Sequence, residues 1–256
     1  MAISWNTGTT ATSGGPGAVF LDITIPAGVN QGDLLLVAFA AFSAVSETVQ
    51  ASSTGTAPAI VGSSQAVSFG GNTLNAAVFS VKAGASDAGK VLRGSYVSGG
   101  LAQWAAGIGA WAGTSASSPV DVSGAAVSAG ASATITCPSE ITAASNDWCA
   151  EIVSAALGGS SFTGGAGFTQ REAFSDPASG CTVLIYDSNA SAGPAGTSIG
   201  GAQFANAGHN NWWAGFTVGL APPPPPPGAE GAPDRHHHRT PAGKPGQARI
   251  GRGGLR

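Results

Sequence analysis

Charged residues are unusually scarce in this sequence. Only 9% of its 256 residues are Asp, Glu, Lys or Arg, against about 25% in an average globular protein. So few charges indicate that partner subunits cover part of the surface, which predicts a homo-oligomer. Residues 1–221 hold four basic and eleven acidic residues, whereas residues 222–256 hold six basic and two acidic ones. An acidic body with a basic tail indicates two different neighbours.

Cysteine, signal sequences and long apolar runs are scarce or missing too. Cys137, Cys149 and Cys181 are too few for a disulfide scaffold, so free buried thiols are expected. A Cys137–Cys149 bridge is the alternative if the protein meets an oxidising exterior. The longest apolar run, residues 34–42, is half as long as a membrane-spanning helix and fits a buried strand. Because the first residues lack the basic and apolar regions of a signal peptide, folding in a cytoplasm is expected.

Helical periodicity is hard to find, and alternation of apolar and polar residues takes its place. In residues 19–25 the apolar side chains fall on one face, with Asp22 and Thr24 on the other. Residues 83–90 are expected to form one helical turn. Ten strands are predicted between Gly- and Pro-containing turns: 19–25, 34–42, 74–81, 91–97, 104–111, 133–137, 148–157, 168–174, 181–186 and 213–218. This pattern predicts an all-β fold, an antiparallel β-sandwich of jelly-roll type over residues 1–221.

Tryptophans divide into core candidates and ligand candidates. Trp104 and Trp111 lie among glycine and alanine, and small neighbours let two sheets approach closely around large rings. Both are therefore predicted to lie in the core. Trp148, Trp212 and Trp213 are candidate ligand-binding residues. Since successive strand residues point to opposite faces, either Trp212 or Trp213 must face outward or lie at an interface.

Catalytic motifs are weak. The stretch GTSIG at residues 196–200 matches a nucleophile elbow, but the acid and then histidine that this chemistry needs do not follow. A turn is predicted there instead. Asp147 and Glu151, like Glu172 and Asp176, are four residues apart, and nothing marks either pair as the acids of a glycosidase. The sequence therefore predicts no enzyme and no cofactor.

The apolar pattern stops at residue 221. Six prolines at 222–227 predict a polyproline II spacer roughly 19 Å long, followed by a disordered basic tail to residue 256. His236, His237 and His238 are weak metal candidates because convergent ligands are missing. Without aromatic residues for base stacking, the tail is not expected to bind nucleic acid. Its candidate contacts to an acidic protein surface are Arg235, Arg239, Arg249, Arg252 and Arg256.

Three stretches carry a resemblance to a known family. They are IPAGVNQGDLLL at residues 25–36, the aromatic and glycine-rich strand and turn of residues 104–119, and the segment from YDSN at residue 186 to residue 220. Together they resemble β-rich minor tail and virion surface proteins of actinobacterial (mycobacterial) tailed phages. The resemblance spans about residues 17–220 and leaves the Pro-rich basic tail unexplained.

The resemblance implies a non-enzymatic structural protein of a bacteriophage virion. It implies a minor tail protein that is assembled in the host cytoplasm, displayed on the particle and bound to other virion proteins, with host-surface glycan as a further partner. Two alternatives stay open. A capsid decoration or head-fibre protein also needs a compact β domain with an anchoring arm. A carbohydrate-binding module or glycan-active enzyme would use exposed tryptophans.

Overall fold

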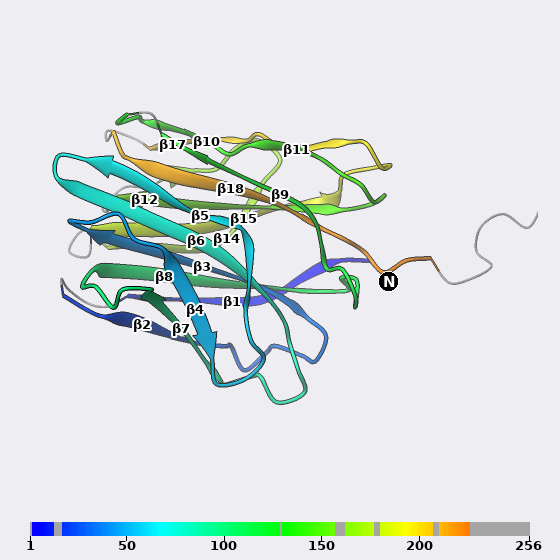
Figure 1. The fold of residues 1–256 in the computed structure, drawn as a ribbon. Helices are drawn as coiled ribbons and strands as arrows, with labels where there is room; N and C mark the ends of the chain where they lie inside the picture. Colours follow the sequence, from blue (N-terminus) through cyan, green and yellow to red (C-terminus); the bar gives the residue numbers. More distant parts are fainter. Residues whose placement is uncertain are drawn as a thin grey trace, which may run out of the picture. The chain divides into compact units, whose positions relative to one another are not determined.

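Strands and turns make up the described chain in the computed structural model (Figure 1). The structure describes residues 2–12, 17–128, 130–156, 162–176, 180–206 and 210–225. Contacts divide the chain into a compact unit, Met1–Pro223, and a second unit, Pro224–Arg256, nearly all of which lies outside the described residues. Across the described residues, no helix is long and apolar enough to span a membrane. The all-β prediction is confirmed.

Eighteen strands are found in the described residues, in two consecutive groups. The first group is β1 (Ser4–Thr12), β2 (Phe20–Thr24), β3 (Leu34–Ser43), β4 (Val49–Ser53), β5 (Ala59–Phe69), β6 (Asn72–Lys82), β7 (Val91–Tyr96) and β8 (Gln103–Ala112). The second group is β9 (Val120–Val127), β10 (Thr134–Thr136), β11 (Ser139–Ile141), β12 (Trp148–Ala156), β13 (Phe162–Thr163), β14 (Thr169–Asp176), β15 (Cys181–Ser191), β16 (Ser198–Gly200), β17 (Gln203–Asn206) and β18 (Trp213–Leu220).

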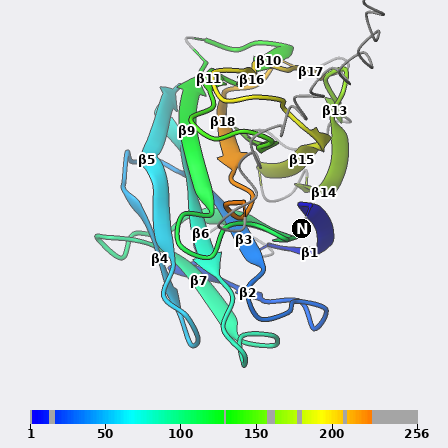
Figure 2. The ribbon, with the colours of Figure 1, turned by 90° about the vertical axis from the view of Figure 1, so that its right-hand side faces the viewer.

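Each group forms a β-sandwich-like pair of layers. In the first sandwich (residues 4–112), the five-stranded sheet β1-β8-β3-β6-β5 is covered by the three-stranded sheet β2-β7-β4. In the second sandwich (residues 120–220), the five-stranded sheet β14-β15-β12-β18-β9 is covered by the small sheets β10-β17-β13 and β11-β16. The two five-stranded sheets face each other across a third apolar layer (Figures 1 and 2). The sequence predicted one sandwich, whereas the strand pairing builds two.

The two sandwiches repeat one topology. Read from the matching edge, β9-β18-β12-β15-β14 follows the order of β1-β8-β3-β6-β5, and β10-β17-β13 follows β2-β7-β4. Both first strands carry a register shift at the same place, after Trp5 in β1 and after Val120 in β9. Contacts place β1 against β14 and β5 against β9. Equivalent strands thus meet crosswise, as they do around a twofold axis that runs along the strands.

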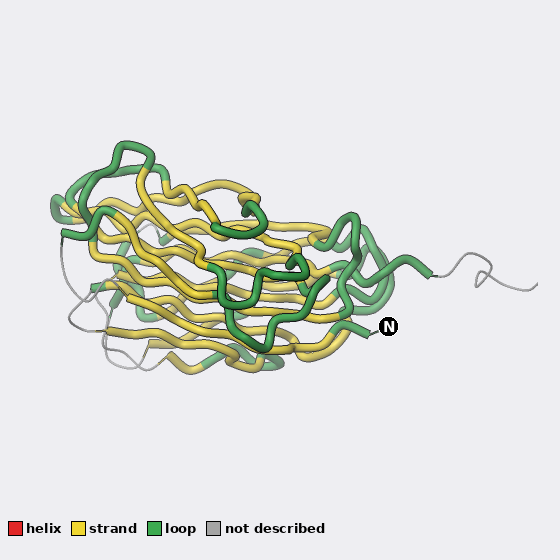
Figure 3. Tube along the Cα trace, turned by 90° about the horizontal axis from the view of Figure 1, so that it is seen from below, coloured by secondary structure: helices red, strands yellow, loops and turns green. Residues whose placement is uncertain are grey.

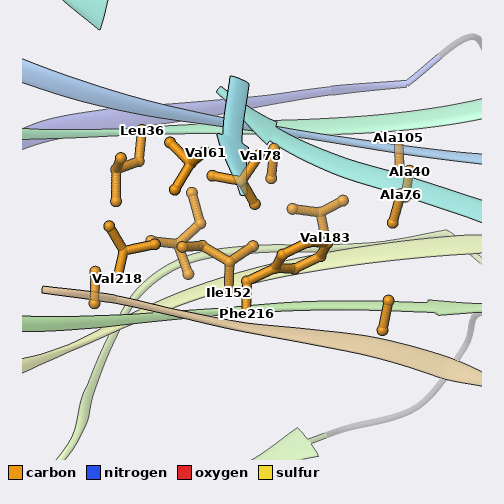
Figure 4. Packing of buried hydrophobic residues seen from close by; sticks show 14 of the residues in the cluster. Leu36, Ala40, Val61, Ala76, Val78, Ala105, Ile152, Val183, Phe216 and Val218 are labelled. Carbon is orange, nitrogen blue, oxygen red and sulfur yellow. The ribbon is translucent and has the colours of Figure 1, made fainter. Parts of the chain in front are cut away.

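Burial explains why the central strands read as continuous apolar runs. Strand β3 has core on both faces: Leu34 and Leu36 point between the sandwiches, while Leu35 and Phe39 point into the first sandwich. A strand covered on both sides needs apolar residues at every position. Figure 4 shows Leu36 and its neighbours facing residues of β12 and β18 across the layer between the sandwiches.

Several predictions about individual residues are settled by this packing. Trp104 and Trp111 are fully buried, as predicted. Cys137, Cys149 and Cys181 are buried thiols that form no disulfide, so buried thiols are confirmed over the Cys137–Cys149 bridge.

The helical turn expected at residues 83–90 is wrong, because these residues form turns. The carboxylate of Asp87 accepts hydrogen bonds from the backbone N–H groups of Gly84 (2.7 Å) and Thr56 (3.1 Å). An aspartate that bonds nearby backbone N–H groups offers the chain an alternative to helix.

Candidate functional site

The body has two ends with different surroundings. At the end called here the exit end, the chain leaves the body at Ala221, whose N–H donates to the carbonyl of Pro119 (3.0 Å) and whose carbonyl accepts from Ser115 (2.7 Å). The opposite ends of the strands form the far end, which includes residues 17–20, 43–48 and 96–102. Figure 3 shows many loops of the body at the two ends of the strands, with further loop segments over the face seen from below.

Exposed apolar side chains concentrate at the far end of the first sandwich. Backbone bonds tie their loops together: Ala18 pairs with Ala102, and the N–H of Val97 donates to Thr48 (3.1 Å). Five of the eight large apolar side chains that are exposed in the described residues form this far-end patch: Val19 (44%), Phe20 (41%), Val45 (48%), Val97 (63%) and Leu101 (59%). Gathered apolar side chains at a surface indicate a contact region more than scattered ones do.

An open pocket of about 210 Å³ adjoins the far-end patch. An aromatic ring, side-chain amides and a hydroxyl line it, and no charged residue does. The lining residues include Phe42, Ser43, Asn72, Leu101 and Gln103. Apolar walls with a few polar groups suit a small uncharged ligand that has both an apolar face and hydroxyl groups, such as a sugar.

A stack of three aromatic rings continues from the pocket wall to the second sandwich. The ring of Phe42 stacks on Phe69 with centroids 5.6 Å apart, and Phe69 stacks on Trp212 at 3.8 Å with the planes 7° apart. The first two rings belong to β3 and β5, and Trp212 directly precedes β18. The stack therefore joins the two sandwiches at the far end and covers one face of Trp212.

The three predicted ligand-binding tryptophans do not share a site. Trp213 is 7% exposed and packs in the core of the second sandwich. Trp148 is half-buried at the start of β12, at the exit end. Trp212, also half-buried, packs against the layer between the sandwiches. Of the two adjacent tryptophans, Trp212 is therefore the one at an interface, which is one of the two positions that strand alternation allowed.

The other candidates from the sequence do not form a catalytic or metal site in the described residues. Ser198 lies on β16 rather than in the predicted turn, its hydroxyl is 2.7 Å from that of Ser139, and a strand rather than a helix surrounds it. No group of three or more His, Cys, Asp or Glu within the described ranges could hold a metal ion. The tail candidates, His236–His238 and the five arginines, lie outside the described residues.

Buried acids in the second sandwich are the functional groups that the sequence did not predict. Glu151 is fully buried; one oxygen accepts a hydrogen bond from Ala202 (3.0 Å) and the other has no partner in the described chain. Burial raises the pKa of Glu151 to about 7, against the opposing effect of that hydrogen bond. Burial and the nearby Glu151 also raise the pKa of Cys137 and Cys149, so these thiols stay neutral and unreactive.

A buried ion pair lies between the two sandwiches at the exit end. Asp187 of β15 is fully buried and accepts from Arg171 of β14 (2.9 Å) and from the indole N–H of Trp111 on β8 (2.9 Å). The guanidinium of Arg171 also donates to Asn189 (2.8 Å) and lies 5.5 Å from the ring centroid of Trp5. One carboxylate thus links the facing sheets.

The available signal for these acids was their distribution along the chain. Residues 116–221 hold seven acidic residues and a single basic one, Arg171. Such an imbalance means that some carboxyl groups of a folded segment must lack a cationic partner. Neither a family model, nor a curated protein, nor a solved structure matches this chain.

Proposed function

We propose that the chain is a non-enzymatic structural protein of a bacteriophage virion, a minor tail protein whose far end contacts host-surface glycan. The observation that carries this proposal is the opposite placement of two features. The chain runs into its proline-rich basic segment at the exit end, while the far-end patch and the uncharged pocket lie at the other end of the strands. A displayed protein needs its attachment and its contact surface separated in this way.

The strand order supports a jelly-roll assignment for each sandwich. In the first, β1, β3, β5, β6 and β8 belong to one sheet and β2, β4 and β7 to the other, so the chain crosses between layers at every step except from β5 to β6. That alternation is the connection pattern of a jelly roll. It fits the resemblance to virion surface proteins and is shared by many unrelated ones, so the function rests on the two ends of the body rather than on the fold.

Locating the chain in particles tests the proposed placement. We expect mass spectrometry of purified virions of the encoding phage to detect this chain, and a gold label on the C-terminal tail to decorate tails in electron micrographs. Label on heads would instead favour a capsid decoration or head-fibre protein. Absence of the chain from the particles would rule out both placements.

A matched pair of substitutions tests the contact surface. Leu101→Asp at the far end and Ile141→Asp at the exit end alter side chains that are each 59% exposed. We expect Leu101→Asp to weaken binding to host cell-envelope fragments at least about tenfold, the loss of one central contact. Ile141→Asp should leave binding unchanged. Equal binding by both variants, measured by co-sedimentation, would exclude the far end as the contact surface.

Trp212→Ala separates the aromatic stack from the pocket. Trp212 stacks on Phe69 but does not line the pocket, whereas Asn72 does. We expect Asn72→Ala to reduce glycan binding and Trp212→Ala to lower thermal stability without a comparable loss of binding. The reverse result, measured on glycan arrays and by thermal melting, would make Trp212 the ligand-stacking residue of a carbohydrate-binding module.

A further inference from the structure

The repeated topology allows the two sandwiches to be compared residue by residue at the exit end. Asp33 directly precedes β3, and Asp147 directly precedes the equivalent strand β12. Asn6 follows Trp5 at the bulge of β1, and Asp121 follows Val120 at the bulge of β9. Asn6 and Asp121 are therefore equivalent positions, as are Asp33 and Asp147.

The two sandwiches fill these positions with different chemistry. In the first, the side-chain amide of Asn6 donates to the carboxylate of Asp33 (2.6 Å), which also accepts from the N–H of Asn30 (2.9 Å). In the second, the carboxyl group of Asp121 faces that of Asp147. An amide can donate to a carboxylate, but an ionised carboxylate only accepts. The second pair can form the same bond only when one of its members holds a proton.

Asp147 depends on that proton. Its side chain is fully buried, and neither of its oxygens accepts a hydrogen bond from an N–H or O–H group of the described chain. Asp121, by contrast, accepts from the backbone N–H groups of Ala143 (2.6 Å) and Ala144 (3.0 Å). Burial, followed by the interaction with Asp121, raises the pKa of Asp147 to about 7. For Asp121, hydrogen bonds outweigh the effect of burial and lower the pKa.

No described basic group compensates this pair. Among the neighbouring elements, β11 contributes Glu140, which lies against Gly124 of β9, and β12 contributes Cys149 and Glu151. Residues 192–197, which bond to the loop of residues 142–147, contain no titratable side chain. The one arginine of this sandwich, Arg171, is bonded to Asp187 on β15. In the first sandwich, by contrast, the basic side chain of Lys82 interacts electrostatically with Asp33.

We propose that Asp121 and Asp147 form a proton-dependent latch, closed when the two carboxyl groups share one proton and open when both are ionised. The latch fastens the loop of residues 142–147 to the start of β9. Opening of the latch acts close to the point where the chain leaves the body. Asp121 is two residues from Pro119, whose carbonyl accepts a hydrogen bond from the N–H of Ala221. This inference does not depend on the proposed virion function.

Hydrogen–deuterium exchange of the full chain tests the latch. After correction for intrinsic exchange, we expect the amides of residues 142–147 to exchange at least about tenfold faster at pH 8.5 than at pH 5.5 in the native protein, since each pH unit beyond the pKa is a factor of ten. Asp121→Asn recreates the amide–carboxylate pair of the first sandwich and keeps an oxygen for Ala143 and Ala144. We expect this variant to stay protected at both pH values.

Two further variants and a measurement with added calcium complete the test. Asp147→Asn places the amide on the other partner and should also remove the pH dependence. Asn6→Asp should create a new pH dependence in residues 26–33, weakened by the nearby Lys82. The latch is overturned if Asp121→Asn retains the native pH dependence. It is equally overturned if millimolar CaCl₂ alone protects the native loop at pH 8.5 and fails to protect Asp121→Asn, because the pair is then a cation site.

Discussion

Arg171→Ala is expected to lower the free energy of unfolding by about 3–5 kcal/mol, the usual cost of removing one partner from a buried ion pair. Asp187 has no exposed side-chain surface and lies 2.9 Å from the guanidinium of Arg171. Without that cation, its charge would remain buried, with only the indole N–H of Trp111 and the backbone N–H of Asn189 as donors. Because Asp187 and Trp111 belong to different sandwiches, the loss falls on the interface that holds the body together.

The chain provides a matched control in its other Arg–Asp pair. Arg93 and Asp22 are 2.7 Å apart, but their side chains are 45% and 40% exposed. Arg93 also lies over an aromatic ring, that of Phe20, at 3.6 Å. We expect Arg93→Ala to lower the free energy of unfolding far less than Arg171→Ala does, because an exposed ion pair is screened by solvent and contributes little to stability. Urea denaturation of both variants at pH 7 measures the difference, and similar losses would contradict the role assigned to burial.

Glu151→Gln is expected to stabilise the protein above pH 7 by about 3 kcal/mol at most, from the 1.4 kcal/mol that each pKa unit represents. Glu151 binds its proton more tightly in the folded chain, with a pKa of about 7, than in the unfolded chain, where it is 4.5. The stability that the folded state gains from this tighter proton binding is therefore fully present below pH 4.5 and is lost as the pH rises to about 7. Glutamine keeps the oxygen that accepts from Ala202 and carries no charge.

Denaturation of the native protein and the variant at pH 5 and pH 8 measures this effect. The difference in the free energy of unfolding between the native protein and Glu151→Gln should be large at pH 8 and small at pH 5. The native protein itself should lose stability over this interval, because Asp147 has the same sign of shift. Glu151→Val copies the equivalent residue of the first sandwich, Val37, but leaves the N–H of Ala202 without its acceptor. It should therefore be less stable than Glu151→Gln, and the opposite order would contradict the assigned hydrogen bond.

Bulky apolar residues made ten strands predictable, and their absence hid others. The predicted strands overlap β2, β3, β6, β7, β8, β10, β12, β14, β15 and β18. Strands β1 and β4 consist mostly of Ser, Thr, Gly and Ala. In β5 and β9, apolar and polar residues alternate only weakly along the strand. Such edge and covering strands are fixed by pairing with a partner strand, which a local sequence pattern does not report.

The doubled architecture and the buried acids depend on contacts between distant residues. The repeat survives in the sequence in little more than Ile-Thr-x-Pro, at Ile23 and again at Ile135. In the sequence, Asp147 and Glu151 were only two acids four residues apart, with nothing to mark the pair. The carboxyl group of Asp147 interacts instead with that of Asp121, 26 residues earlier and on strand β9. For the candidate ligand-binding tryptophans, strand alternation predicted that either Trp212 or Trp213 faces outward or lies at an interface. It did not decide which of the two, and it could not show that Trp148 lies at the opposite end.

The crosswise contact of the two sandwiches gives one chain the geometry of a homodimer without the constraint of its symmetry. In a true twofold dimer every substitution occurs twice, once in each subunit, and both copies of a site change together. Here each position is encoded separately. The exchange of an amide for a carboxylate between Asn6 and Asp121 is an example: one half keeps a permanent bond while the other acquires a titratable one. Covalent fusion thus frees each half to specialise while the shared interface stays intact.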